Sequence, residues 1–378
     1  MYEQDIFDPE AVGGLGLVVL ESIRSVGEKI DEHLKYERAK RGLPYPKSYI
    51  IPAKEIRFSN GEGKVKLTES VRGKDIYVLC DIGNYSCKYA LYGYENHKGP
   101  DEHFQDIKRA LSAIGGKAKR VTVLMPLLYA SRQDKRKGRE SLDCAMALQE
   151  LERLGVKDII TFDAHNPNVQ NAVPLASFEN LYATYDIVRT FFDDEPEILR
   201  DKNNLLIISP DSGGMERAIY YSSVMDVDVG MFYKRRDFST VIHGKNPIVQ
   251  HDYLGRDVRG RNIIIIDDMI ASGESILDIV KELKSRGANK VFVATTFALF
   301  TEGADKFNDY YEKGLFDRVY STNLTYVSES IKESPWLRLV DMSRYMAQII
   351  QSLNHSKSIE PLIDSTEKLR ATIQDYRK

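Results

Sequence analysis

The segment Ile263–Ile266 places four isoleucines in succession, and two carboxylates, Asp267 and Asp268, follow it directly. An uninterrupted β-branched run is typical of a strand that is covered on both faces, as in a parallel sheet flanked by helices. The next residues, Ile276–Arg286, carry apolar side chains at helical spacing. This order of strand and helix predicts an α/β fold with a parallel sheet.

The same alternation recurs along the chain, with helical patterns such as Leu142–Leu154 and Met342–Leu353 between short apolar runs. The other predicted strands are Ile76–Cys80, Val121–Met125, Ile159–Phe162, Leu205–Ile208, Val227–Phe232 and Val291–Thr295. The order of helix, glycine and strand around Gly155 is repeated around Gly287. We therefore expect two similar α/β halves, joined near residue 190.

The N-terminal segment shows a different pattern. Between residues 10 and 43, apolar positions from Leu17 to Leu34 recur at three or four residues, which predicts a helix with one buried stripe. Pro44 and Pro46 then end it. We predict a helical extension at residues 1–47 and a first domain at 48–190, completed by 341–378. The second domain is predicted at 191–340.

Composition excludes several classes of protein. The 378 residues are 42% hydrophobic and 29% charged with a net charge of -3, which favours neither nucleic-acid nor membrane-surface binding. The N-terminus lacks the basic start of a secretory signal, and no apolar run is long enough to span a bilayer. Cys80, Cys87 and Cys144 are too few and too scattered for a disulfide framework or a zinc site. We expect a cytoplasmic protein with reduced thiols.

Polar groups at the end of the Ile263–Ile266 strand suit a sugar phosphate. Asp267 and Asp268 can hold sugar hydroxyls or a cation at the strand end, where α/β proteins place their ligands. The turn Ser272–Ser275 then leads into a helix N-terminus, whose free N–H groups and dipole can bind a phosphate. A helix cap with acidic residues would give a similar pattern, so this segment alone does not decide.

Three further polar segments follow predicted strands. Asp163 and His165 point the same way on an extended chain, so both can reach one magnesium ion. The loop Tyr129–Arg139 holds five basic side chains that suit polyphosphate oxygens. Lys234–Arg236 open a polar stretch to Arg261 that suits a mobile flap over a transferring diphosphate. Each segment alone also suits a solvated turn or a polar strand end, but together they predict a metal–nucleotide site.

These motifs resemble those of the ribose-phosphate diphosphokinases, also called phosphoribosyl diphosphate synthetases. The resemblance spans roughly residues 50 to 355, with the motifs in the same order. It rests on Arg57–Glu62 and Glu69–Gly73 (adenine contact), Tyr129–Arg136 with one inserted residue (nucleotide loop), Asp163-x-His165 (magnesium), Ser209–Gly214, Lys234 and Arg236 (flexible loop) and Asp267–Ser275 (ribose-phosphate loop).

The resemblance implies two tandem phosphoribosyltransferase-like domains and a Mg²⁺-dependent diphosphotransferase that uses ATP and ribose 5-phosphate. It also implies a homo-oligomer. The implied roles are ATP binding by Phe58, Asn60, Glu62, Arg132, Gln133 and Asp134; metal binding by Asp163, His165 and Asp211; catalysis by Lys234 and Arg236; and ribose-phosphate binding by Asp267, Asp268, Ala271, Ser272, Gly273 and Ser275.

Some positions depart from the family pattern. Ala271 replaces the usual acidic residue, and Glu274 places a carboxylate beside the expected phosphate, which is unfavourable unless it turns to solvent. The segment Asp81–Lys117 is longer than usual. Glu274 motivates a second hypothesis, in which the acceptor is a larger 5-phosphate ester such as ADP-ribose. A third hypothesis is a non-catalytic regulatory homologue, which should have lost residues such as Lys234. A plain phosphoribosyltransferase would not need the nucleotide motifs.

Overall fold

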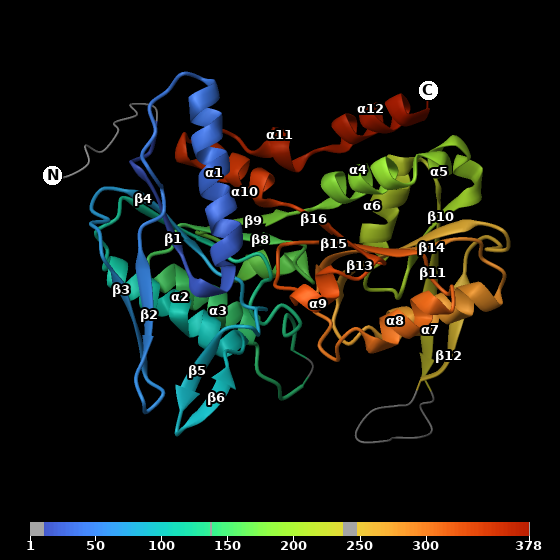
Figure 1. Cartoon of the computed structure of the whole chain (residues 1–378), viewed down its shortest axis with the longest axis horizontal. Helices are drawn as coiled ribbons and strands as arrows, with labels where there is room; N and C mark the ends of the chain where they lie inside the picture. Colours follow the sequence, from blue (N-terminus) through green and yellow to red (C-terminus); the bar gives the residue numbers. More distant parts are fainter. Residues whose placement is uncertain (1–10, 137, 237–247, 378) are drawn as a thin grey trace. The chain divides into compact units, whose positions relative to one another are not determined.

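The computed structural model describes residues 11–136, 138–236 and 248–377 (Figure 1). The chain divides into two compact units. The first unit contains the chain up to Tyr182 together with Asn323–Tyr326 and Asp341–Asp364, and the second contains Ala183–Thr322, Val327–Val340 and the chain from Ser365 onward. The predicted domain boundaries differ at the C-terminus, because the residues from Ser365 onward belong to the second unit.

The first unit is built on a five-stranded parallel sheet, and all of its strands but the last are mainly buried because helices cover both faces. Helix α1 packs against α10 on one face, while α2 and α3 lie on the other (Figure 1). The strand order is β1 (Leu15–Val19), β4 (Asp75–Leu79), β7 (Arg120–Leu124), β8 (Asp158–Phe162) and β9 (Ser177–Leu181). The helices are η1 (Glu21–Ile23), α1 (Arg24–Lys40), α2 (Pro100–Ile114), α3 (Asp143–Arg153), η2 (Pro167–Ala172), α10 (Ser343–Asn354) and α11 (Glu360–Ile363).

Two antiparallel hairpins belong to the first unit but stand outside its central sheet. One joins β2 (Ala53–Arg57) to β3 (Gly63–Leu67), and the other joins β5 (Lys88–Leu91) to β6 (Tyr94–His97). The loop between β2 and β3 holds the expected adenine segment. The β5–β6 hairpin lies within the segment Asp81–Lys117, which the family resemblance predicts to be longer than usual.

The prediction of one helix over residues 10–43 is wrong in its first part. Leu15–Val19 form an edge strand that pairs in parallel with β4, and α1 begins only at Arg24. All residues from Leu17 to Leu20 are buried, and a short apolar run of this kind cannot be told from a helix by its spacing alone. The described part of segment 1–47 therefore completes the sheet of the first unit as well as providing a helix.

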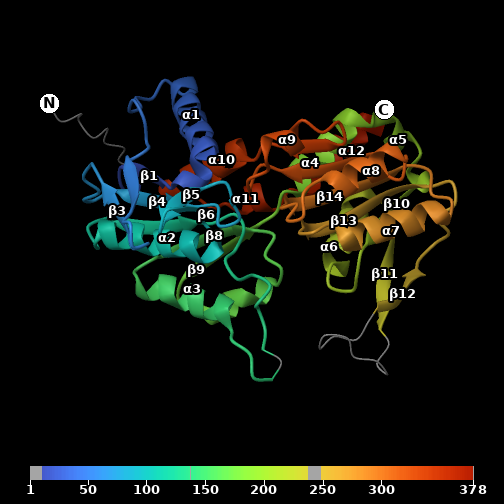
Figure 2. The same cartoon turned by 60° about the horizontal axis from the view of Figure 1, so that its bottom comes forward.

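The second unit contains a seven-stranded sheet that is parallel except for β12, which runs antiparallel to β11. Helices cover both of its faces (Figures 1 and 2). The strand order is β12 (Ile248–Leu254), β11 (Asp228–Arg236), β10 (Leu205–Ser209), β13 (Asn262–Ile270), β14 (Val291–Ala298), β15 (Arg318–Thr322) and β16 (Leu337–Val340). The helices are α4 (Thr184–Asp194), α5 (Pro196–Arg200), η3 (Lys202–Asn204), α6 (Met215–Met225), α7 (Glu274–Ser285), α8 (Asp305–Glu312), α9 (Glu329–Lys332) and α12 (Thr366–Arg377).

An aromatic cluster around Trp336 fixes helix α8 in the second unit. The Trp336 ring is fully buried and lies 5.6 Å from the Phe300 ring and 5.3 Å from the Phe307 ring, measured between centroids. Trp336 Nε1 also donates a hydrogen bond of 2.8 Å to Asn308 Oδ1. Because Phe307 and Asn308 are both on α8, the cluster holds the start of this helix in one place.

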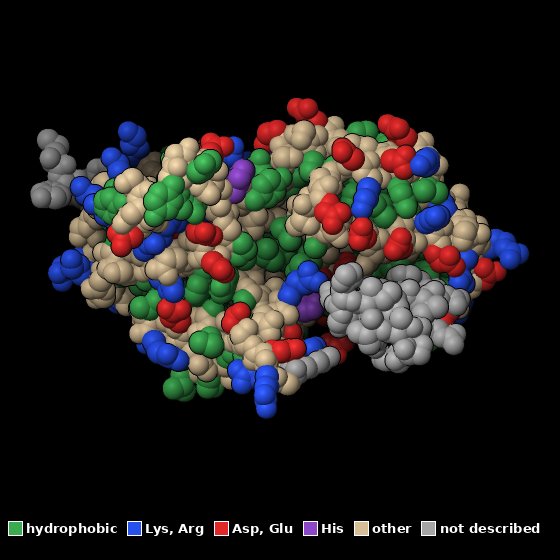
Figure 3. Space-filling view, turned by 90° about the horizontal axis from the view of Figure 1, so that it is seen from below, with side chains coloured by type: hydrophobic (Ala, Val, Ile, Leu, Met, Phe, Trp, Pro, Cys, Tyr) green, Lys and Arg blue, Asp and Glu red, His purple; other side chains and the backbone are tan. Residues whose placement is uncertain are grey.

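The surface charge and the state of the cysteines match what the composition predicts. On the face drawn in Figure 3, acidic and basic side chains are interspersed, in keeping with the near-neutral net charge of -3. Cys80, Cys87 and Cys144 are buried free thiols. Within the described parts of the chain, every helix is either too short or too polar to cross a bilayer.

A buried carboxyl group anchors the segment Asn323–Tyr326 in the first unit. Asp81 follows β4 and accepts hydrogen bonds from Thr325 Oγ1 (3.1 Å), from the Tyr326 backbone N–H (2.7 Å) and from that of Gly83 (2.9 Å). Burial raises the pKa of Asp81 to about 7, although these hydrogen bonds oppose the shift. The folded protein therefore binds a proton that the unfolded chain releases near pH 4.

The stabilisation by protonated Asp81 is expected to be lost as the pH rises from 4 to above 7, since its pKa is higher in the folded state. Relative to Asp81→Asn, the free energy of unfolding of the wild type should fall by up to about 4 kcal/mol over this range. Urea denaturation of both proteins at each pH measures the difference. A difference that stays constant with pH would contradict the raised pKa.

Candidate active site

Three neighbouring parallel strands of the second unit end at the same edge of the sheet. The register pairs Ser209 of β10 with Met231 of β11, and Ile208 of β10 with Ile265 of β13. Asp211, Lys234 and Asp267 lie just beyond these pairs along their strands. Because the carboxyl ends of parallel strands form the ligand-binding edge of an α/β sheet, the fold brings these three sequence-predicted positions together.

Lys234 and Arg236 lie within a strand and not, as predicted, after one. Strand β11 continues to Arg236, and Lys234 pairs with His251 of the antiparallel strand β12. The strand extends because β12 satisfies backbone groups beyond the end of the parallel sheet. The predicted flap from Lys234 to Arg261 is thus in part a hairpin. The side chains of Lys234 and Arg236 and all of residues 237–247 lie outside the described residues.

The two adjacent carboxylates also lie within a strand, since β13 continues to Ile270 through pairing with β14. Asp267 Oδ1 accepts a hydrogen bond from the Asp268 backbone N–H (2.9 Å), and Asp268 Oδ1 accepts one from Met269 N–H (2.8 Å). Burial, and then the neighbouring Asp268 carboxylate, raise the pKa of Asp267 well above its usual range, while Arg217 opposes the shift. A cation or hydroxyl donors placed beside Asp267 would stabilise its ionised carboxylate.

The turn after β13 forms a compact cradle that requires a glycine. Gly273 has a φ of +84°, and a Cβ at this position would lie 2.4 Å from Phe307 Cε2. The backbone N–H of Thr301 donates to the Ala271 carbonyl (3.0 Å), so the segment after β14 braces the turn. Helix α7 begins at Glu274, directly after this turn, while Ser272 is half-buried and Ser275 exposed. The N-terminus of a helix of this length suits a phosphate.

The side chain of Glu274 points to solvent, which removes the conflict expected beside a phosphate. It forms an ion pair of 2.9 Å with Lys306 of α8, and Lys306 also pairs with Glu302 at 3.3 Å. Phe307, the next residue, is buried against Gly273 and so presents Lys306 near the cradle. The negative charge of Glu274 is therefore balanced locally by a cation.

Lys306→Ala is expected to raise the KM for the sugar phosphate about two- to fivefold, because it leaves the Glu274 charge uncompensated near the helix N-terminus. Adding Glu274→Gln should restore the wild-type KM. Initial rates at varied sugar phosphate measure both. The matched control is Lys313→Ala on the same helix, which breaks only the 2.6 Å pair with Asp309. A double variant as impaired as Lys306→Ala alone would contradict the compensation.

The first unit brings two other predicted segments together. Strands β7 and β8 are adjacent and parallel, so the Tyr129–Arg139 loop and the residues after Phe162 meet at one edge of the sheet. Asn166 Nδ2 donates a hydrogen bond of 2.7 Å to Asp134 Oδ2, which ties the segments together. Gln133 Nε2 donates to the Ser141 carbonyl (2.8 Å), whereas Arg132 is exposed. Asp134 and Gln133 thus shape the loop, and Arg132 faces solvent.

Asp163 and His165 differ in burial, and the chain at Asp163 is not extended as the prediction assumed. Asp163 has a φ of +42° and is buried, whereas His165 is exposed. The prediction assumed an extended chain, in which alternate residues share a face, but the left-handed turn at Asp163 breaks this alternation. The Ala164 N–H donates to Asn180 Oδ1 (2.9 Å), which helps to hold the turn.

The expected adenine segment forms the loop of the β2–β3 hairpin. The Phe58 N–H donates to the Glu62 carbonyl (2.8 Å), and Asn60 Nδ2 donates to Glu62 Oε2 (3.0 Å), which orders the loop. The Phe58 ring is 45% exposed, and Lys64 Nζ lies 5.2 Å from its centroid. An exposed aromatic ring beside a cation can stack on a nucleotide base.

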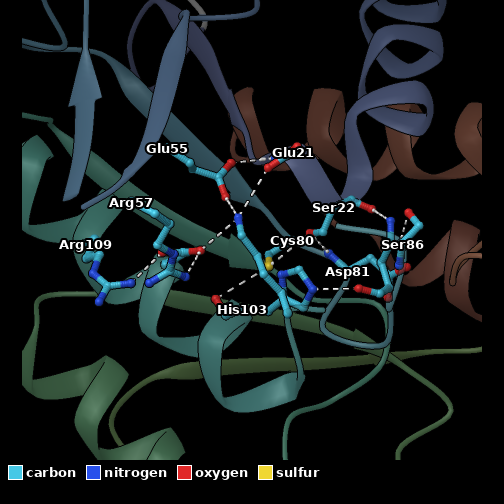
Figure 4. A network of polar contacts seen from close by, with 12 residues as sticks. Glu21, Ser22, Glu55, Arg57, Cys80, Asp81, Ser86, His103 and Arg109 are labelled. Carbon is cyan, nitrogen blue, oxygen red and sulfur yellow. Dashed lines mark hydrogen bonds and ion pairs between the residues drawn. The ribbon is translucent and has the colours of Figure 1, made fainter. Parts of the chain in front are cut away.

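A buried ionic network beside strand β2 of this hairpin was missed from the sequence. Lys98 Nζ lies 2.8 Å from Glu55 of β2 and 3.2 Å from Asp106 of α2, and Arg57 pairs with Asp106 at 2.9 Å (Figure 4). Burial lowers the pKa of Lys98, but the neighbouring carboxylates outweigh it and hold the pKa above its usual value. The groups come from segments far apart in the chain, so no local motif signals that they meet.

Comparisons with known proteins identify both domains. Residues 15–155 match the N-terminal domain of ribose phosphate pyrophosphokinase, and residues 177–333 match the phosphoribosyl transferase domain. A ribose-phosphate pyrophosphokinase of Chromobacterium violaceum is 27% identical over 84% of this chain and 88% of its own length. One of Ralstonia nicotianae is 30% identical over 66% of this chain and 71% of its own length.

The fold has a known counterpart as well. The crystal structure of phosphoribosylpyrophosphate synthetase from Mycobacterium smegmatis aligns with a TM-score of 0.70 at 22% identity, covering 90% of this chain and 98% of that one. The expected α/β fold with two phosphoribosyltransferase-like domains is thereby confirmed, as is the resemblance read from the motifs. Two matching domains in order along the chain, together with 30% identity to a relative, place this protein in the ribose-phosphate pyrophosphokinase family.

Proposed function

We propose that this protein transfers the β,γ-diphosphate of ATP to the C1 hydroxyl of ribose 5-phosphate, with Mg²⁺ as cofactor. The observation that carries the proposal is the segment Asp267–Ser275. It combines two adjacent carboxylates at the ligand-binding edge of the sheet with a glycine-dependent cradle at a helix N-terminus. A sugar phosphate needs both parts, one for its hydroxyls and one for its 5-phosphate.

The residues of the chain have separate tasks in this reaction. The cradle from Ala271 to Ser275 would bind the 5-phosphate, while Asp267 and Asp268 would orient the ribose hydroxyls. The C1 oxygen then attacks the β-phosphorus of ATP, the bond from that phosphorus to the α,β-bridging oxygen breaks, and AMP leaves with that oxygen. The hydroxyl proton passes to solvent. Lys234 and Arg236 would stabilise the charge that develops on the diphosphate.

The donor set suits magnesium. In the second unit, Asp211 supplies a carboxylate just beyond β10, and this ion is usually bound by one or two carboxylates plus substrate phosphates and water. In the first unit, Asp163 is the proposed carboxylate, just beyond β8. Asp211 Oδ1 accepts hydrogen bonds from the Gly213 and Gly214 N–H groups (2.8 and 3.2 Å), which orients its carboxylate. His165, whose side chain is exposed, is the other proposed magnesium-binding residue of the first unit. When bound, the ion would neutralise the phosphate oxygens.

Free ribose 5-phosphate is the better supported acceptor. The ester hypothesis rested on repulsion between Glu274 and a terminal phosphate, and Lys306 compensates that charge. The family membership points to the same acceptor.

The deciding experiment incubates the protein with ATP, Mg²⁺ and either ribose 5-phosphate or ADP-ribose, and follows AMP release together with the phosphorus NMR spectrum. A new sugar diphosphate with ribose 5-phosphate is expected. Product formed only from ADP-ribose would support the ester acceptor, and no product from either sugar would support the non-catalytic homologue.

We also propose that the protein is a cytoplasmic homo-oligomer. The support is its composition and the family resemblance. Light scattering at several protein concentrations measures the mass of the particle in solution. A mass near the 43.1 kDa of one chain would contradict the proposed homo-oligomer.

A further inference from the structure

The β5–β6 hairpin has two chemically different faces. Directly opposed residues of an antiparallel pair share a face, as do alternate residues along a strand. The register therefore places Tyr89, Leu91, Tyr94 and Asn96 on one face, and Lys88, Ala90, Glu95 and His97 on the other. The second face is charged and exposed, with an ion pair of 2.7 Å between Lys88 and Glu95.

The first face of this hairpin packs on the loop that carries the adenine segment. Leu91 lies against Gly61, since a Cβ on Gly61 would be 3.1 Å from Leu91 Cδ1. The Arg57 guanidinium, at the end of β2, lies 5.4 Å from the centroid of the Tyr89 ring. The tips of the two hairpins thus lie side by side (Figure 1). Arg57 is itself fixed by Asp106 at 2.9 Å, so this contact has a rigid support (Figure 4).

Tyr94 differs from the other residues on this face. Tyr89, Leu91 and Asn96 are half-buried, and the first two contact the β2–β3 hairpin, whereas Tyr94 is 76% exposed. Tyr94 sits directly opposite Leu91, the residue that contacts the nucleotide loop. A large aromatic ring is therefore presented to solvent beside the Phe58–Glu62 loop, and its apolar surface is left uncovered.

We propose that Tyr94 is a specificity-determining residue of the nucleotide site and that its ring contacts the base of ATP, in addition to the ring of Phe58. This inference rests on the proposed function. A purine base offers two flat apolar faces, and aromatic side chains stack on such faces. The residue belongs to the segment Asp81–Lys117, which none of the recognised motifs includes. The added hairpin thereby becomes part of the nucleotide site.

The test compares Tyr94→Ala with Tyr94→Phe and with Tyr92→Asn. Tyr92 is equally prominent at 81% exposure but lies in the turn with a φ of +51°, which asparagine tolerates. Tyr94→Ala is expected to raise the KM for ATP roughly tenfold, with kcat and the KM for ribose 5-phosphate nearly unchanged. Tyr94→Phe should retain the wild-type KM for ATP because it keeps the ring, and Tyr92→Asn should behave as wild type.

Binding of ATP with Mg²⁺ by calorimetry gives a second readout that does not depend on turnover. If the wild type forms no AMP but Tyr94→Ala weakens ATP binding about tenfold, the proposed function fails and this inference stands. Unchanged ATP affinity and KM in Tyr94→Ala overturn the inference, whether or not the enzyme is active. A change in oligomer size without a change in the KM for ATP would also overturn it and assign the ring to a contact between copies.

Discussion

Lys234→Ala is expected to lower kcat by about 10²- to 10³-fold while leaving the affinity for ATP nearly intact. The reason is that a cation aimed at the transferring diphosphate contributes mainly in the transition state, where charge builds up on the phosphoryl oxygens. The backbone of Lys234 lies on the strand next to β10, and Asp211 follows β10 at the same edge of the sheet. Steady-state kinetics with calorimetric ATP binding measures the two effects separately.

A matched control for this variant is Lys313→Ala, which also removes one lysine from the second unit but breaks only an exposed pair with Asp309. It should retain wild-type turnover. If Lys234→Ala weakened ATP binding as much as it slowed turnover, the lysine would bind the ground state and the catalytic role would be wrong.

Gly273→Ala is expected to raise the KM for ribose 5-phosphate by about ten- to a hundredfold. An alanine pays about 1–2 kcal/mol to adopt a left-handed backbone. At φ +84°, its Cβ would also lie 2.4 Å from the Phe307 ring, which the Trp336 cluster holds in place. The turn must therefore move, and with it the N–H groups that would bind the phosphate. Initial rates at varied ribose 5-phosphate measure the effect.

Gly287→Ala separates this effect from ordinary glycine strain. Gly287 follows the other end of α7 with nearly the same φ of +86°, but the nearest atoms to a Cβ there all belong to Arg259, with Cγ at 3.3 Å and Cα and Cβ at 3.9 Å. This variant should lose some stability and keep the KM for the sugar phosphate. Equal changes in KM for the two variants would show that the cradle geometry is not what binds the phosphate.

The sequence was sufficient to predict the α/β class and most buried strands. Runs such as Ile263–Ile266 are apolar on every residue because both faces of a parallel sheet are covered, and this signal is local. The turn Ser272–Ser275 was also predictable, since it stands between a strand and an amphipathic helix. The order of the motifs identified the family before any three-dimensional contact was known.

Other features depended on partners that are distant in the chain. Strand β13 extends past Asp267 because β14 pairs with it, and β11 extends past Lys234 because β12 does, so strand ends could not be read from hydrophobicity. Leu15–Val19 form a strand because their backbone pairs with β4, which lies about sixty residues later in the chain. The left-handed turn at Asp163 could not be predicted, because no glycine stands at this position.

The contacts of helix α10 in the first unit affect when this unit can fold during synthesis of the chain. Its helix α10 supplies the Leu353 carbonyl, which accepts a hydrogen bond from Arg120 (2.8 Å), and Asn354, which donates to the buried Asp75 carboxylate (2.9 Å). The two partners of α10, Arg120 and Asp75, are translated more than two hundred residues earlier. A ribosome must therefore translate the chain at least as far as Asn354 before this unit can close its polar interior, and the second unit likewise needs its later helix α12.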